Sequence, residues 1–141
     1  MSLVAKRFDE AKGGKSVRLF KSHREGIADG EQKRDFVHVD DAVAVMRWLL
    51  DTPSVSGIFN VGSGKARSFR DLITAMFLAL GREPDIEYVD MPSTIRDQYQ
   101  YFTQANVENL RRAGYNAGFT PLEEGVYRYV TLFLNQPDRY R

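Results

Sequence analysis

The residues with the clearest capacity for chemistry lie between positions 33 and 41, which read Lys-Arg-Asp-Phe-Val-His-Val-Asp-Asp. Residues 35–39 are predicted to form a strand, and Asp40 or Asp41 is predicted to cap the helix that follows. Arg34 then stands at the start of a strand, from which a planar guanidinium can bind a phosphate through two parallel hydrogen bonds. The alternative is a surface ion pair with a neighbouring acid, namely Asp29, Glu31 or Asp35. The residues themselves leave both roles open.

A glycine-rich turn, Gly62-Ser63-Gly64-Lys65, invites comparison with a phosphate-binding loop. That loop needs a glycine five positions before Gly64, where Phe59 stands, and a Ser or Thr after the lysine, where Ala66 stands. The chain also has no G-x-G-x-x-G sequence, and no tyrosine is followed by a lysine four residues later. We therefore interpret the glycines as turn residues and expect no nicotinamide cofactor to bind this chain in the usual way.

Residues 21–32 form a long polar connection with two glycines and no periodicity. Connections of about 12 residues without secondary structure are often functional, which makes this one a candidate binding loop, although an ordinary surface loop fits equally well. His23 lies in it beside Lys21 and Arg24, where the imidazole can donate to a phosphate or be solvated. The other histidine, His38, is interpreted as structural.

An aromatic group formed by Tyr99, Tyr101 and Phe102 follows Arg96. Aromatic rings next to a cation can stack on a base or sugar. They can also pack against the helix that Thr103 is predicted to begin. Both interpretations remain open from the sequence.

Composition limits the classes of function. The chain has 141 residues and a net charge of +1, so it fits one domain, and no global field would draw it onto nucleic acid. It has no cysteine and only two distant histidines, which argues against disulfides and a structural zinc site. The absence of a long apolar run or signal peptide favours a soluble cytoplasmic protein without a membrane partner.

The predicted elements alternate between helices and short strands, as expected for the α/β class. Their number and length are more typical of a substrate or cap domain than of a complete catalytic fold. The predicted helices cover residues 3–12, 40–50, 69–80, 103–113 and 121–134, and the strands cover 16–20, 35–39, 57–61 and 86–89.

The segment Gln32–Asp41 resembles the Arg-Asp-x-x-x-Val-x-Asp element in the C-terminal half of extended short-chain dehydrogenase/reductases that act on nucleotide sugars. Residues 19–23, 57–64 and 99–115 resemble, in order and spacing, the ADP-heptose epimerases of this family. The resemblance covers nearly the whole chain. It implies a single α/β domain, residues 1–141, which is the small C-terminal substrate-binding part of a larger enzyme, without the Rossmann domain.

In that family the Rossmann domain holds NADP and the catalytic tyrosine and lysine, so the resemblance implies no catalytic, cofactor-binding or metal-binding residue in this chain. At Lys6 the family commonly has a histidine, and that contact is not carried over. The residues that match the family's substrate contacts are Phe20, Lys21, Ser22, His23, Arg34 and Tyr99.

The implied reaction is inversion at C6 of ADP-D-glycero-β-D-manno-heptose by NADP-dependent oxidation and reduction, for lipopolysaccharide core synthesis in the cytoplasm. The implied partners are ADP-heptose, the enzyme's own N-terminal Rossmann domain and further copies of the same chain. No nucleic acid and no metal is expected. The chain alone is expected to be inactive.

Two other functions remain open at this stage. One is a free-standing module that binds a nucleotide sugar or a partner without catalysis. The other is the matching domain of an enzyme for a UDP- or GDP-sugar, which the shared Arg-Asp element also allows. A Rossmann sequence and a Tyr-x-x-x-Lys pair encoded in frame before Met1 would distinguish an enzyme fragment from a free-standing module.

Overall fold

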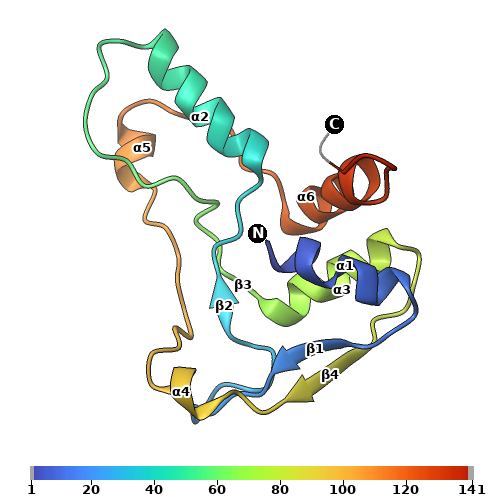
Figure 1. Cartoon of the computed structure of the whole chain (residues 1–141). Helices are drawn as coiled ribbons and strands as arrows, with labels where there is room; N and C mark the ends of the chain where they lie inside the picture. The colour runs from blue at the N-terminus through green and yellow to red at the C-terminus, as the bar shows by residue number, and fades with distance from the viewer. Residues whose placement is uncertain (1, 140–141) are drawn as a thin grey trace.

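Two parallel strands and three helices form the larger part of the fold (Figure 1). In the computed structural model, which describes residues 2–139, strand β1 (Val17–Phe20) pairs with β4 (Ile86–Val89) over four residues. Helices α1 (Leu3–Lys12), α3 (Phe69–Ala79) and α6 (Leu122–Tyr129) pack together on one side of this ribbon. The π-helical turn η1 (Val130–Leu134) extends α6.

The largest apolar cluster lies where these helices meet β1. Phe8 of α1 and Ile73, Met76 and Phe77 of α3 are fully buried there. Ser68 begins α3 with a capping box, in which its hydroxyl accepts from the Asp71 amide and the Asp71 carboxylate accepts from the Ser68 amide. The side of the ribbon that faces the helices is therefore closed by a well-defined core.

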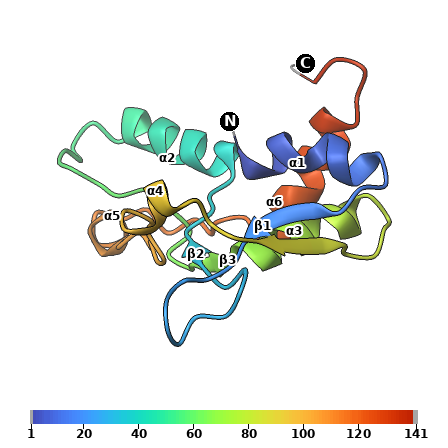
Figure 2. The same ribbon diagram turned by 60° about the horizontal axis from the view of Figure 1, so that its bottom comes forward.

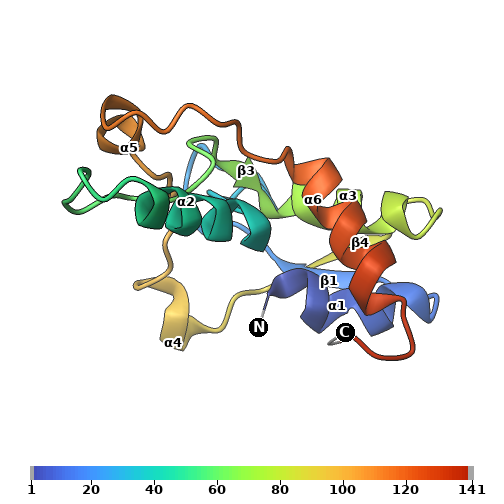
Figure 3. The same cartoon turned by 90° about the horizontal axis from the view of Figure 1, so that it is seen from above.

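A second, smaller cluster lies apart from the first, between helices α2 (Val39–Asp51) and α5 (Glu108–Arg112) (Figure 3). Val45 of α2 packs against Leu110 and Tyr115. A different stripe of α2 is apolar and exposed, and Leu50 at its end is 81% accessible. The residues of this stripe are Val39, Val43, Met46 and Leu50. Helix α2 thus has one apolar face in contact with the rest of the chain and another facing solvent.

Strand β2 (Lys33–Arg34) is bonded to two segments that lie far from it in the sequence. It pairs in antiparallel fashion with β3 (Arg67–Ser68). On its other side the Lys33 amide donates to the Tyr101 carbonyl at 2.9 Å, and the Thr103 amide donates to the Lys33 carbonyl at 3.2 Å. Short helix α4 (Ser93–Arg96) precedes that segment. The backbone of β2 therefore lies between residues 67–68 and 101–103.

The carboxylate of Asp35, one residue after β2, binds two loops at once. Its Oδ1 accepts from the amide and the hydroxyl of Ser63, at 2.8 and 2.5 Å. Its Oδ2 accepts from the amides of Gly64 and Ala105, at 2.9 and 3.0 Å. A Cβ atom at Gly62 would lie 2.7 Å from this Oδ2 and 2.6 Å from the Ala105 Cβ, so only glycine fits there. The glycine turn thus encloses a carboxylate of the same chain.

Asp41 makes a similar contact in the first turn of α2. Its two carboxylate oxygens accept from the amide and the hydroxyl of Thr120, each at 2.8 Å. This contact holds the segment that leads into α6 against the start of α2. The two neighbouring acids therefore have different roles: Asp41 binds Thr120, while Asp40 stays exposed in the same turn of the helix.

The α/β class is confirmed, as are the helices near residues 3–12, 69–80 and 121–134 and the strands near 16–20 and 86–89. No helix between residues 2 and 139 has the length and apolar character that crossing a membrane would require. Helix α4 was not predicted, because four residues give no measurable period.

The predicted strands at 35–39 and 57–61 are wrong. Residues 35–38 are irregular because the Asp35 side chain is turned toward residues 63, 64 and 105, and the short strand lies before them, at Lys33–Arg34. Residues 57–61 have no strand partner within the described part of the chain, and their alternation alone does not form a strand.

Two predicted helix starts are also wrong. The N-cap of α2 is His38, whose Nδ1 accepts from the Asp40 amide at 3.3 Å, rather than Asp40 or Asp41. Thr103 does not begin a helix: its amide donates to the Lys33 carbonyl of β2, and α5 starts only at Glu108. The interpretation of His38 as structural is confirmed by this cap and by the position of its ring against Gly125.

We predict that Asp35→Asn lowers the free energy of unfolding by about 2 kcal/mol at pH 7, measured by urea denaturation, because an NH₂ group would replace an oxygen that accepts hydrogen bonds. Burial by itself would raise the pKa of Asp35, but hydrogen bonds from Ser63, Ala105 and Gly64 lower the pKa overall. The folded state therefore favours the carboxylate. Its contribution should be present above the unfolded pKa of about 3.9 and be lost as the pH falls further, through the lower pKa of the folded state.

The matched control is Asp40→Asn, which removes an exposed carboxylate from the same helix start and should change stability by less than about 0.5 kcal/mol. The role assigned to Asp35 would be contradicted if both substitutions lowered the free energy of unfolding equally. It would also be contradicted if the difference in that free energy between the wild type and Asp35→Asn did not shrink in acid.

Candidate functional site

The six residues predicted to contact substrate come from three segments that the fold brings together beyond the end of β1. Phe20 ends β1, and Lys21, Ser22 and His23 continue from it, while Arg34 lies in β2 and Tyr99 follows α4 (Figure 2). The ring of Tyr99 meets Phe20 edge-on, with centroids 6.3 Å apart, and Tyr101 at 5.5 Å. The aromatic group predicted from the sequence thus forms in part: Tyr99 and Tyr101 are in contact and Phe20 joins them, whereas Phe102 is exposed.

Arg34 lies against two aromatic rings. Its guanidinium carbon is 5.6 Å from the centroid of Phe69 and 5.7 Å from that of Tyr99. One of its nitrogens donates to the Lys33 carbonyl at 2.8 Å, and another donates to the carbonyl of Gln100. Part of the guanidinium therefore has a structural role, since it fixes Tyr99 and its neighbour to β2.

The acids proposed as salt-bridge partners of Arg34 are engaged elsewhere. Asp29 accepts from the Ser22 amide at 2.6 Å, Glu31 pairs with Arg70, and Asp35 binds the loops described above. The interpretation of Arg34 as one half of a surface ion pair is therefore wrong. Its place at the edge of the aromatic group keeps it in the candidate site.

A hollow of about 520 Å³ opens beside Tyr99. Two arginines face it, Arg24 from the loop and Arg96 from α4, and the guanidinium of Arg24 lies 5.6 Å from the ring centroid of Tyr101. Arg96 is held in place by donating to the Met91 carbonyl at 2.7 Å. The residues that line the hollow are His23, Arg24, Arg96, Asp97, Tyr99 and Tyr101. Cations and aromatic rings around one opening suit a nucleotide diphosphate.

His23 is fixed in this hollow by its backbone and its ring. Its amide donates to the Tyr101 hydroxyl at 3.1 Å, and its Nε2 accepts from the Met91 amide at 3.3 Å. The Asp90 carboxylate lies 4.0 Å from this nitrogen and 3.6 Å from the Lys21 Nζ. Lys21 is therefore directed toward Asp90 rather than into the hollow.

Burial raises the pKa of the Tyr99 phenol, and the nearby positive charge of Arg34 acts in the opposite direction. The phenol consequently stays protonated at neutral pH and can donate a hydrogen bond to a ligand oxygen.

The residues present do not fit a nicotinamide cofactor. The amides of Ser63 and Gly64, which a phosphate would need, already donate to Asp35. Among residues 2–139 no three His, Cys, Asp or Glu side chains come together as a metal site. The residues that line the hollow beside Tyr99 carry positive charge and aromatic rings, which suit an anionic ligand with an aromatic group.

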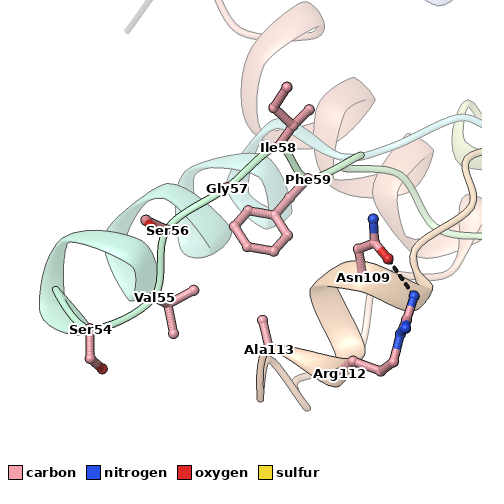
Figure 4. Close-up of a pocket in the computed structure, with 9 residues that line it drawn as sticks. All are labelled: Ser54, Val55, Ser56, Gly57, Ile58, Phe59, Asn109, Arg112 and Ala113. Atoms are coloured by element: carbon pink, nitrogen blue, oxygen red, sulfur yellow. Dashed lines mark hydrogen bonds between the residues drawn. The ribbon is translucent and has the colours of Figure 1, made fainter.

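A second hollow of about 480 Å³ lies between residues 54–59 and α5 (Figure 4). Phe59 points into it, and Arg112 is bound to Asn109, whose Oδ1 accepts at 2.6 Å. None of the six predicted residues lines this second hollow, and Arg112 is the one basic side chain among the residues that line it. The hollow beside Tyr99 is the better candidate because charge and aromatic rings converge there.

Of the six predicted residues, only His23 and Tyr99 line the hollow beside Tyr99, and four others that line it were not predicted as site residues. These residues are Arg24, Arg96, Asp97 and Tyr101. The available signals were the basic residue directly after His23 and the spacing of Tyr99 and Tyr101. Neither signal shows that residues 23–24 and 96–101 face one another.

Comparison with known proteins places these observations in a family. Residues 1–62 match the sequence profile of the NAD dependent epimerase/dehydratase family. The chain is 48% identical over 139 residues to an ADP-L-glycero-D-manno-heptose-6-epimerase of Nitratidesulfovibrio vulgaris strain DP4, covering 99% of this chain and 43% of that protein. It is 42% identical to the protein of the same name from Fusobacterium nucleatum, covering 99% and 44%. The chain thus spans less than half the length of these curated relatives.

Solved structures agree. The ADP-L-glycero-D-manno-heptose-6-epimerase of Helicobacter pylori matches 92% of this chain and 36% of its own, with a TM-score of 0.72 and 27% identity. The UDP-glucose 4-epimerase of Thermus thermophilus, solved in complex with NAD, matches 88% and 37% with a TM-score of 0.65 and 26% identity. The chain therefore belongs to the NAD dependent epimerase/dehydratase family, in which it is similar to the C-terminal part of ADP-L-glycero-D-manno-heptose-6-epimerases.

Proposed function

We propose that this chain is a single substrate-binding domain that holds the ADP portion of an ADP-heptose in the hollow beside Tyr99. The observation that carries the proposal is the convergence of arginines and tyrosines from the loop at 21–32 and the segment at 96–101. Arg24 and Arg96 would bind the diphosphate, and Tyr99 and Tyr101 would pack against the base or ribose. Phe20, Ser22, His23 and Arg34 complete the proposed substrate shell. Lys21, which the family resemblance also assigns to it, would have to leave Asp90 to reach the ligand.

The names of the relatives support ADP-heptose over a UDP- or GDP-sugar, because the proteins that match at 40–49% identity are ADP-heptose epimerases. In a protein of their length, the reaction would be NADP-dependent inversion at C6 of the heptose, in the cytoplasm, for lipopolysaccharide core synthesis. The residues described here would bind and orient the substrate, while the redox chemistry would belong to the part of the relatives that this chain does not cover.

The exposed stripe of α2 supports a contact with that uncovered part. Val39 is 66% and Leu50 81% accessible, although both are apolar and lie on the same face of the helix. We propose that the cofactor-binding portion of an epimerase covers the stripe. Association with further copies of the chain is proposed on the family resemblance alone.

Titration with ADP tests the binding proposal. Arg24→Ala should weaken ADP binding about tenfold or more, because a charged hydrogen bond contributes roughly 1.5–3 kcal/mol, and should leave the melting temperature unchanged. Arg34→Ala should weaken binding and also lower the melting temperature, since Arg34 binds the Gln100 carbonyl. Arg34→Lys should recover only part of both losses, because an ammonium lacks the planar fork.

Isothermal titration calorimetry with ADP, UDP and GDP, together with melting curves, measures these effects. The control is Arg47→Ala, which removes an exposed arginine of α2 far along the chain from the hollow. Normal ADP affinity in both Arg24→Ala and Arg34→Ala would refute the site, and a preference for UDP or GDP would reassign the substrate.

The chain alone should not convert ADP-D-glycero-β-D-manno-heptose in the presence of NADP, because the glycine turn is filled by Asp35 and no Tyr-x-x-x-Lys pair exists in the sequence. Product chromatography, with the intact Nitratidesulfovibrio vulgaris relative as positive control, gives the answer. Conversion above the protein-free background would show that the proposed division of labour is wrong.

Replacing Met46 and Leu50 together by glutamate should leave the melting temperature nearly unchanged, since both side chains are exposed. It should abolish co-purification of this chain with the portion of the Nitratidesulfovibrio vulgaris relative that it does not match, because two charges would be buried in the contact. Ala44→Glu, which adds a charge at an exposed position on another side of α2, should still co-purify. If the glutamate variant also co-purified, the stripe would not be the contact surface.

A further inference from the structure

Gln32 is the most deeply buried polar side chain near the proposed site. It is 1% accessible, and Ser68 is the other buried polar residue among those described. Its Nε2 lies 3.3 Å from the carbonyl oxygens of both Phe20 and Lys21 and donates to them. A buried amide at this position is costly unless it is bonded, so its orientation is constrained.

The contact closes the loop at residues 21–32 at its base. Phe20 and Lys21 begin the loop, and Gln32 ends it directly before β2. The backbone of Gln32 is held as well, because its carbonyl accepts from the Phe69 amide at 3.1 Å, at the start of α3. One residue therefore links the end of β1, the start of β2 and the start of α3.

The geometry of the proposed site depends on these three elements. The segment Phe20–His23 leaves β1, while Arg34 follows Gln32 by two residues and lies against Phe69. A rotation or shift of residues 20–23 relative to β2 would move His23 and Arg24 with respect to Tyr99. Beyond the base, the Ser22 amide is bound to Asp29 and the His23 amide to Tyr101, which are partly exposed contacts. The buried amide is thus the part of this arrangement best protected from water.

We infer that Gln32 is a positioning residue, whose side-chain amide holds residues 20–23 in register with β2 so that the loop and Arg34 act on one ligand. This inference rests on the proposed function for its ligand, ADP. Gln32 itself does not line the hollow.

The test compares Gln32→Met with Val130→Ala in the full chain. Methionine keeps an unbranched side chain of similar length and removes both donors, whereas Val130→Ala creates a small cavity in the main core, away from the loop. Both are measured well below their melting transitions. Gln32→Met should weaken ADP binding by about tenfold. It should also accelerate amide exchange at Ser22 and His23 about tenfold, and Val130→Ala should do neither.

Each other outcome is informative. Equal effects of the two variants on affinity and exchange would show that Gln32 contributes only to general stability, which overturns the inference. Normal affinity and exchange in Gln32→Met would overturn it too. Failure of the wild-type chain to bind ADP would refute the proposed function instead, and the exchange comparison would then decide alone whether Gln32 positions the segment.

Discussion

The carboxylate of Asp35 is the interaction on which the arrangement of the loops depends. Four donors from Ser63, Gly64 and Ala105 converge on its two oxygens, and no side chain fits at Gly62 beside them. Each hydrogen bond to a charged group is worth roughly 1.5–3 kcal/mol in favourable cases, and losing the carboxylate would leave several amides unsatisfied together. Since Asp35 directly follows β2, the same contact fixes where Arg34 lies.

Because the net charge of the chain is only +1, an anionic ligand would have to be bound by positive charges that are gathered locally. Arg24, Arg34 and Arg96 lie on aromatic rings or bind carbonyls, so each is held before a ligand arrives. Such preorganisation reduces the entropy lost on binding, at the cost of using some of the arginine donors internally. Arg34 shows this balance most clearly, because its contacts with Gln100 and Tyr99 stabilise the site while leaving part of the guanidinium for other partners.

Apolar side chains are buried unevenly along the chain. The main core is well buried, but the second cluster is small, and Ile58 nearby is 92% accessible. Helix α2 is apolar over most of its circumference, a pattern typical of a helix packed on more than one side. The proposed contact with a cofactor-binding portion would cover the exposed stripe of α2.

The α/β class and the long helices followed from the sequence, because apolar periodicity and capping residues such as Ser68 act over a few neighbouring positions. The same local information identified Arg34 and Tyr99 as candidates and excluded a phosphate loop at Gly64. Tertiary structure alone decided the rest. Residues 35–39 and 57–61 alternate as strands do, yet a strand exists only where a neighbouring backbone supplies hydrogen bonds, and β2 found its partners at 67–68 and 101–103 instead. Likewise, the pairing of Asp35 with Ser63 and the meeting of Arg24 with Arg96 join residues far apart in the chain, which no local pattern encodes.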